Sequence, residues 1–181
     1  MIRAAELIAS FKQVAVDRTT SNRRRFQLLE VVDEVILTLT PVIKQKSINV
    51  ERDIPETIYF ESYPGDLGQV LTNLIDNAIK HAFDGRDTGA IQISATRLDE
   101  ASVRLTVTDN GKGMDAHIVD KIFDPFFTTK MGQGGTGLGM HVTYNAVVSI
   151  LGGAIEVDSQ PETGSTFRID LPLIGPETTT L

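Results

Sequence analysis

The sequence has no cysteine, only three histidines, fewer basic than acidic residues, and no long apolar run. The absence of cysteine excludes a disulfide framework, thiol catalysis and thiolate metal ligands. The histidines, His81, His117 and His141, are widely separated, which argues against a zinc site. The 17 basic and 24 acidic residues give a formal net charge of -7, which argues against general nucleic-acid binding.

No stretch approaches the roughly 18 apolar residues of a membrane span, and the first residues lack a cleavable signal pattern. We therefore expect a cytoplasmic location without membrane contact by this chain. If the chain is part of a longer protein, that protein could still be anchored in the inner membrane. A length of 181 residues, with 41% hydrophobic and 23% charged residues, is typical of one folded domain with a short extension.

The two ends of the chain differ from its middle. Apolar residues at three- and four-residue spacing between Ala4 and Ala15 predict a first helix, followed by a boundary near residues 17 to 24. The basic cluster at residues 23–25 is expected in a solvated turn. The last nine residues, 173–181, are expected to form a frayed tail.

Between these ends, helical and strand patterns succeed one another. Helices are predicted for Leu29–Lys46, for Pro64–Phe83 and from Leu138 to the glycines 152–153; strands are predicted for Ile48–Glu51, Thr57–Phe60, 90–98 and 102–109, and a final hairpin for 154–172. Residues 110–135 show no periodicity, and a loop of this length inside a compact domain is usually functional.

The stretch "NLIDNAIKHA", residues 73–82, puts polar side chains on one side of the predicted helix. Asn73, Asn77 and Lys80 fall within about 60° of one another, opposite the apolar stripe. Amide oxygens can join phosphate oxygens around Mg2+, and a lysine one turn further on can meet phosphate charge. Taken alone, an ordinary solvated face explains the same pattern.

Two glycine-containing stretches suggest ligand contact. In "DNGKGM", residues 109–114, Asp109 ends a strand and could accept a hydrogen bond from an exocyclic amine such as that of adenine, while the glycines let a ligand approach the backbone. The same letters also make a good turn. In "GGTGLGM", residues 134–140, glycines entering a helix suit polyphosphate binding, and a flexible hinge is the alternative. Neither a P-loop nor a dinucleotide fold fits, because the Gly-Lys-Ser/Thr ending and the βαβ frame are missing.

The stretch between them, "IFDPFFTTK" at residues 122–130, carries three phenylalanines. Exposed aromatic side chains are unfavourable, so a lid that folds them down is one interpretation, with Lys130 and Thr128 or Thr129 near the phosphates. Packing of the phenylalanines on the core is the other.

Taken in order, these four stretches resemble the N, G1, F and G2 boxes of the sensor histidine kinase catalytic and ATP-binding domain. The closing "GGAIEVDSQPETGSTFRIDLP" resembles that family's last hairpin, so the resemblance covers roughly Phe26 to Leu173. It implies an α+β fold: a two-layer α/β sandwich whose mixed, mostly antiparallel sheet packs on about three helices, with a long ATP lid. It divides the chain into the end of a dimerisation helix and linker (1–22), the catalytic and ATP-binding domain (23–173) and a flexible tail (174–181).

The resemblance implies ATP and Mg2+ as ligands and assigns roles by motif. Asn77 is implied to hold Mg2+ with Asn73 beside it, and Asp109 to anchor adenine, supported by Thr166. Asn73, Lys80 and Lys130 are implied to act in catalysis. The residues implied to contact nucleotide or metal are Asn73, Asn77, Lys80, His81, Asp109, Gly111, Gly113, Met114, Phe123, Thr128, Thr129, Lys130, Gly135, Thr136, Gly137, Leu138, Gly139, Met140 and Thr166. His81 is either a phosphate-side donor or simply a helix-end histidine.

One position separates activities within the wider superfamily. Gyrase, mismatch-repair and heat-shock chaperone ATPases carry a water-activating glutamate four residues before the metal asparagine, where this chain has Asn73. The resemblance therefore implies slow hydrolysis and transfer of the γ-phosphate to a histidine. In this family an acidic residue follows the acceptor histidine, and none of the three histidines here has one.

We therefore expect the acceptor on a dimerisation domain outside this chain, and the chain to be a piece of a longer kinase that relays phosphate to a response-regulator receiver domain. The whole protein is expected to be a homodimer and this piece a monomer. The alternative is a nucleotide-gated regulatory or interaction module, such as an anti-sigma-type regulator; an autonomous ATPase ranks third because Asn73 replaces the base.

Overall fold

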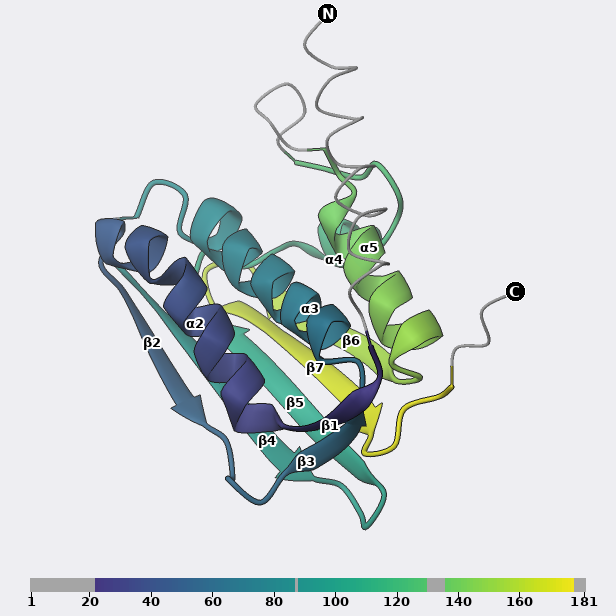
Figure 1. Cartoon of the computed structure of the whole chain (residues 1–181). Helices are drawn as coiled ribbons and strands as arrows, with labels where there is room; N and C mark the ends of the chain where they lie inside the picture. The colour runs from purple at the N-terminus through teal and green to yellow at the C-terminus, as the bar shows by residue number, and fades with distance from the viewer. Residues whose placement is uncertain (1–21, 87, 130–135, 178–181) are drawn as a thin grey trace, which may run out of the picture.

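A computed structural model describes residues 22–86, 88–129 and 136–177 of the chain (Figure 1). The strands are β1 (Arg24–Gln27), β2 (Ile48–Asp53), β3 (Tyr59–Ser62), β4 (Gly89–Arg97), β5 (Ser102–Asp109), β6 (Ala154–Gln160) and β7 (Gly164–Pro172). The α-helices are α2 (Leu28–Gln45), α3 (Pro64–Asn77), α4 (Ala116–Val119) and α5 (Gly139–Asn145), and π-helical turns at Ala78–Ala82 and Ala146–Ile150 extend α3 and α5. No helix in these three ranges is long and apolar enough to cross a membrane.

The architecture has two layers. Five strands form a sheet in the order β2-β4-β5-β7-β6, in which only the β2–β4 pair is parallel. Helices α2, α3 and α5 cover one face of this sheet (Figure 1). Strands β1 and β3 form a separate antiparallel pair. The predicted two-layer sandwich with a mixed, mostly antiparallel sheet on about three helices is thereby confirmed.

The alternation of side chains along β5 and β7 decides which residues face the helices. In β5, Val103, Leu105 and Val107 are buried and the residues between them are partly exposed. Leu71 and Ile75 of α3 are fully buried in the same core. Burial of such apolar surface is the main force that holds the layers together. Because the alternation continues to the last residue of β5, Asp109 also faces the helix layer and is buried.

The solvated turn predicted for residues 23–25 is wrong. Residues 24–27 pair with β3 as strand β1, and Arg23 forms an ion pair with Glu61 at 2.7 Å. The reason is the next residue, because Phe26 is buried and stacks on Phe60 with ring centroids 5.7 Å apart. An aromatic anchor on a partner 34 positions away in the chain is invisible to a local turn rule.

The frayed tail predicted from residue 173 or 174 onward is also wrong as far as residue 177. Ile174 bridges to Glu61, and the Gly175 N–H donates to the Glu61 carbonyl at 2.9 Å. The Tyr63 hydroxyl donates to the Pro176 carbonyl at 3.0 Å. Residues 178–181, and all of the predicted segment 1–22 except Asn22, lie outside the described residues.

Candidate functional site

A pocket of about 340 Å3 lies where the end of α3, the end of β5, the residues after α4 and the start of α5 meet. It is lined by these predicted residues: Asn73, Asn77, Lys80, His81, Asp109, Gly113, Met114, Thr128, Thr129, Thr136, Gly137, Gly139 and Met140. Stretches separated by up to 94 positions in the sequence, from Asn73 to Phe167, therefore share one cavity. A hollow of about 470 Å3 between the β1–β3 pair and the β4–β5 turn holds none of the predicted residues.

Some predicted residues lie elsewhere. Gly111, Phe123, Leu138 and Thr166 do not line the pocket, and Lys130 and Gly135 lie outside the described residues. The lining residues that the sequence did not single out are Asp76, Ala78, Ala82, Lys112, Ile118, Ile122, Phe127, Ser165 and Phe167. Most of these are neighbours of motif residues on the same helix or strand face, so the helical and strand periods around each motif could have found them.

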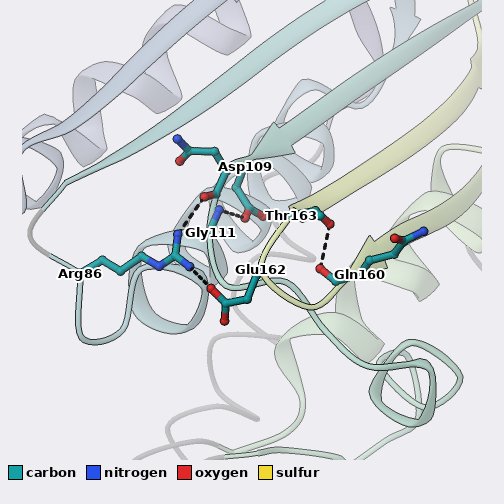
Figure 2. Close-up of polar contacts among 7 residues, drawn as sticks. Arg86, Asp109, Gly111, Gln160, Glu162 and Thr163 are labelled. Atoms are coloured by element: carbon teal, nitrogen blue, oxygen red, sulfur yellow. Dashed lines mark hydrogen bonds and ion pairs between the residues drawn. The ribbon is translucent and has the colours of Figure 1, made fainter.

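Asp109 supplies a buried carboxylate at the sheet end of the pocket. Its exposed fraction is 6%, and its Oδ1 accepts a hydrogen bond from the Gly111 N–H at 2.8 Å (Figure 2). Burial raises the pKa of this carboxyl, while hydrogen bonds from Gly111 and Ser165 and the positive charge of Arg86 act in the opposite direction. An ionised carboxylate held in this way can accept a hydrogen bond from an amine that enters the pocket.

The structure corrects the prediction for Thr166. In the β5–β7 pairing Asp109 lies opposite Ser165, and Ser165 is the residue that hydrogen-bonds the carboxylate. Side chains alternate along a strand, so Thr166 lies on the other face, where its hydroxyl is 3.2 Å from that of Thr108. The apolar residues Phe167 and Ile169 share the parity of Ser165 rather than of Thr166, and this signal was available in the sequence.

The glycines after Asp109 are needed for packing within the protein. A Cβ on Gly111 would lie 2.4 Å from the Ala82 Cβ, which places the loop directly against the π-helical turn. Gly113 has a φ of +66°, and a Cβ there would lie 1.9 Å from the Gln160 carbonyl oxygen. The sequence predicts that these glycines let a ligand approach the backbone. The observed contacts show that the missing side chains also let neighbouring parts of the protein pack closely.

The polar face of α3 meets the pocket, as its spacing predicted. The Asn73 amide nitrogen donates to the Thr143 hydroxyl at 3.1 Å and to the Gly139 carbonyl at 3.4 Å, so Asn73 ties α3 to the start of α5. Its amide oxygen accepts from Gln69 at 2.9 Å. Since that oxygen and the Asp76 carboxylate, which pairs with Lys80, are already engaged, Asn77 is the better oxygen donor for a cation such as Mg2+.

A π-helical turn, Ala78–Ala82, carries Lys80 and His81 toward the pocket. Its wider winding lets the Phe83 N–H bond the Ala78 carbonyl, and the Ile79 carbonyl accepts instead from the Lys46 ammonium at 3.1 Å. Such turns occur often at functional sites. Lys80 itself forms an ion pair with Asp76 at 2.7 Å, so a phosphate that approaches Lys80 meets a lysine already held near a carboxylate.

The three phenylalanines have three different environments. Phe123 packs on α5, with its ring 5.5 Å from that of Tyr144 and its carbonyl 3.1 Å from His141 Nδ1. Phe127 lines the pocket, whereas Phe126 is 56% exposed. Packing on the core therefore holds for Phe123, and Phe127 rather than Phe123 is the one that meets the cavity; the lid interpretation stays a prediction.

The fold is a two-layer sandwich. Its pocket has a buried carboxylate at one end and asparagines, lysine and glycines at the other. These features define the class of protein as a nucleotide-binding catalytic domain. Residues 63–175 match the family model described as histidine kinase-, DNA gyrase B-, and HSP90-like ATPase. The chain belongs to this family. Membership of this family makes ATP the nucleotide that the domain binds.

The relatives narrow the family to sensor kinases. Sporulation kinase A of Bacillus subtilis (strain 168) is 42% identical over 117 residues, covering 65% of this chain and 18% of that protein. Sensor histidine kinase RcsC of Escherichia coli (strain K12) is 32% identical over 176 residues, covering 93% and 18%. The crystallised catalytic domain of histidine kinase ThkA superposes with a TM-score of 0.74 at 28% identity, covering 84% of this chain and 97% of that one. The predicted resemblance to a sensor histidine kinase catalytic and ATP-binding domain is confirmed, and the chain spans 18% of the length of each of the two full kinases.

Proposed function

We propose that this chain is the ATP-binding catalytic domain of a two-component sensor histidine kinase, which transfers the γ-phosphate of ATP to a histidine on a dimerisation domain outside this chain. The observation that carries the proposal is the environment of Asn73. A neutral amide, bonded to Gln69 and Thr143, stands at the position from which a hydrolase would activate water. An amide cannot take a proton from water, so the site favours transfer over hydrolysis.

The chemistry that the chain's own residues supply is positioning and charge neutralisation. The Asp109 carboxylate accepts a hydrogen bond from the adenine amine, which fixes the base end of ATP. Asn77 would hold Mg2+ together with phosphate oxygens, and the bound ion would neutralise phosphate charge. Lys80 adds a positive charge on the same face of the helix, and Gly137 and Gly139 let the phosphates approach the backbone before α5.

The partners follow from this role. They are a histidine-bearing dimerisation domain, through which the whole kinase forms a homodimer, and the receiver domain of a response regulator. Relatives named as sensor histidine kinases support this assignment. So does the sequence, because none of its three histidines is followed by an acidic residue.

Phosphoryl transfer in trans tests the proposal. The purified 181-residue chain should bind ATP and acquire no acid-labile label from γ-labelled ATP. Addition of the parent kinase's histidine-bearing dimerisation domain should produce acid-labile phosphohistidine on that domain. Label on the isolated chain would refute the assignment of the acceptor. ATP binding without transfer in trans would support a nucleotide-gated regulatory module instead.

A further inference from the structure

Arg86 lies outside the pocket, in the turn between the π-helical turn and β4, yet its guanidinium reaches the loop that follows Asp109 (Figure 2). One nitrogen, Nη1, donates to the Asn110 carbonyl at 3.2 Å. The other, Nη2, donates to Glu162 Oε2 at 2.7 Å. Neither Arg86 nor Glu162 belongs to the residues predicted to contact nucleotide or metal.

The contact with Asn110 acts on a single peptide unit. The Asn110 carbonyl and the Gly111 N–H belong to the same planar trans peptide, in which C=O and N–H point in opposite directions. Arg86 binds the carbonyl side, and the N–H on the other side donates to Asp109 Oδ1 at 2.8 Å. A contact that holds the Asn110 carbonyl pointing away from Asp109 therefore directs the Gly111 N–H toward the Asp109 carboxylate.

Glu162 holds the same loop two peptides further on. Its backbone N–H donates to the Lys112 carbonyl at 2.7 Å. Glu162 adopts a φ of +65°, a conformation that is unfavourable by about 1–2 kcal/mol for a residue other than glycine. Its side chain is 78% exposed, so its ion pair with Arg86 contributes little by itself. The effective contact of Glu162 with the loop is made by its backbone.

Arg86 also acts on Asp109 through its charge. Its positive charge lowers the pKa of the Asp109 carboxyl, against the rise that burial causes. The orientation of the peptide and the charge of the side chain thus favour the same state, an ionised carboxylate that keeps its hydrogen bond to Gly111.

We propose that Arg86 is a positioning residue of the base pocket: by holding the Asn110–Gly111 peptide it orients the Asp109 carboxylate toward adenine without touching the nucleotide. The inference rests on the proposed function in one respect, namely that adenine is the base that Asp109 receives.

Four variants of the full chain separate this role from a structural one. Arg86→Met removes charge and donors and keeps the length of the side chain, and Arg86→Lys restores the charge and one donor. Glu162→Gln removes the ion pair but keeps the backbone bond to Lys112. The matched control is Arg104→Met, because Arg104 is equally exposed (37% against 35%) and bonds Asp170 twice at 2.7 Å on the opposite face of the sheet.

Two ligands are titrated against each variant in the presence of Mg2+: ATP, and inorganic tripolyphosphate, which lacks the base. For Arg86→Met we expect the Kd for ATP to rise about tenfold, the loss of one hydrogen bond to a charged donor. The Kd for tripolyphosphate should stay within about twofold. Arg86→Lys should recover part of the ATP affinity, and Glu162→Gln and Arg104→Met should bind both ligands as the parent chain does.

Thermal melting of all variants completes the experiment. If Arg86→Met binds ATP as the parent does, the positioning role is refuted. It is also refuted if ATP and tripolyphosphate weaken equally, or if Glu162→Gln weakens ATP as much as Arg86→Met. ATP binding by the parent chain is measured before any variant is compared. A parent chain that binds no ATP would refute the proposed function instead.

Discussion

Asp109→Asn exchanges the buried carboxylate for a neutral amide of nearly the same size. The amide oxygen can still accept from the Gly111 N–H, but the amide nitrogen then takes the place of the second carboxylate oxygen. A hydrogen bond to a charged group contributes about 1.5–3 kcal/mol, and the nitrogen would meet the adenine amine as donor against donor. We therefore expect ATP to bind about tenfold to a hundredfold more weakly.

The stability of this variant, unlike its ATP affinity, should not fall. Burial raises the pKa of Asp109, so the folded chain binds this proton more tightly than the unfolded chain does. Stability then falls as the pH rises from the ordinary pKa of an aspartate through the raised one, and at pH 7 the ionised carboxylate is a cost to the fold. Asparagine removes that cost, so Asp109→Asn should melt at pH 7 no lower than the parent chain.

Calorimetric titration with ATP and with GTP, together with thermal melting, measures both effects. The amide nitrogen of asparagine can donate to the carbonyl of guanine, so the preference for ATP over GTP should narrow. Asp170→Asn is the matched control, because Asp170 lies on the open face of the sheet and pairs with Arg104. Unchanged ATP affinity in Asp109→Asn would refute the assignment of Asp109 to the base, and a large fall in melting temperature would refute the linkage argument.

Three further predictions concern Asp109, Gly113 and Gly139. ATP affinity should fall as the pH is lowered through the raised pKa of Asp109; since His81 and Lys112 also line the pocket, the pH profile of Asp109→Asn is subtracted, and identical profiles would contradict the prediction. Gly113→Ala should lower the unfolding free energy by more than about 1 kcal/mol, because its Cβ would collide with the Gln160 carbonyl at a positive φ. Gly139→Ala meets no atom within 4 Å, so it should melt like the parent, and any loss of ATP affinity would then report contact with the ligand. Equal melting temperatures for the two alanine variants would overturn this argument.

The sequence predicts the site well wherever the signal is local. The helical period puts Asn73 and Asn77 of α3 on one face with Lys80 of the following π-helical turn, and all three line the pocket. Buried and partly exposed side chains alternate along β5 as far as Asp109, which is buried. Each of these patterns needs only the repeat of one helix or strand.

The sequence fails where a position depends on a partner far along the chain. The motif predicts Thr166 as the residue that supports Asp109, whereas the β5–β7 register places Ser165 opposite it. Residues 24–27 form a strand only because β3 is there to pair with them. Arg86 contacts Glu162 across 76 positions. No spacing rule relates the turn before β4, which holds Arg86, to the turn of the β6–β7 hairpin, which holds Glu162.

The two ends of the pocket are built differently, and this difference bears on mechanism. Main-chain hydrogen bonds tie the loop at the base end to three separate neighbours: Asn110 to Ala90, Lys112 to Ala82 and Glu162 to Lys112. At the phosphate end, the described contacts between elements are made by side chains, as from Asn73 to α5 and from His141 to Phe123. Main-chain bonds between packed elements open less readily than side-chain bonds at a partly exposed surface. If the proposed function is correct, the better-tied end would hold adenine in place and the other end could adjust around the triphosphate, a division that suits a reaction whose catalysis is mainly positioning.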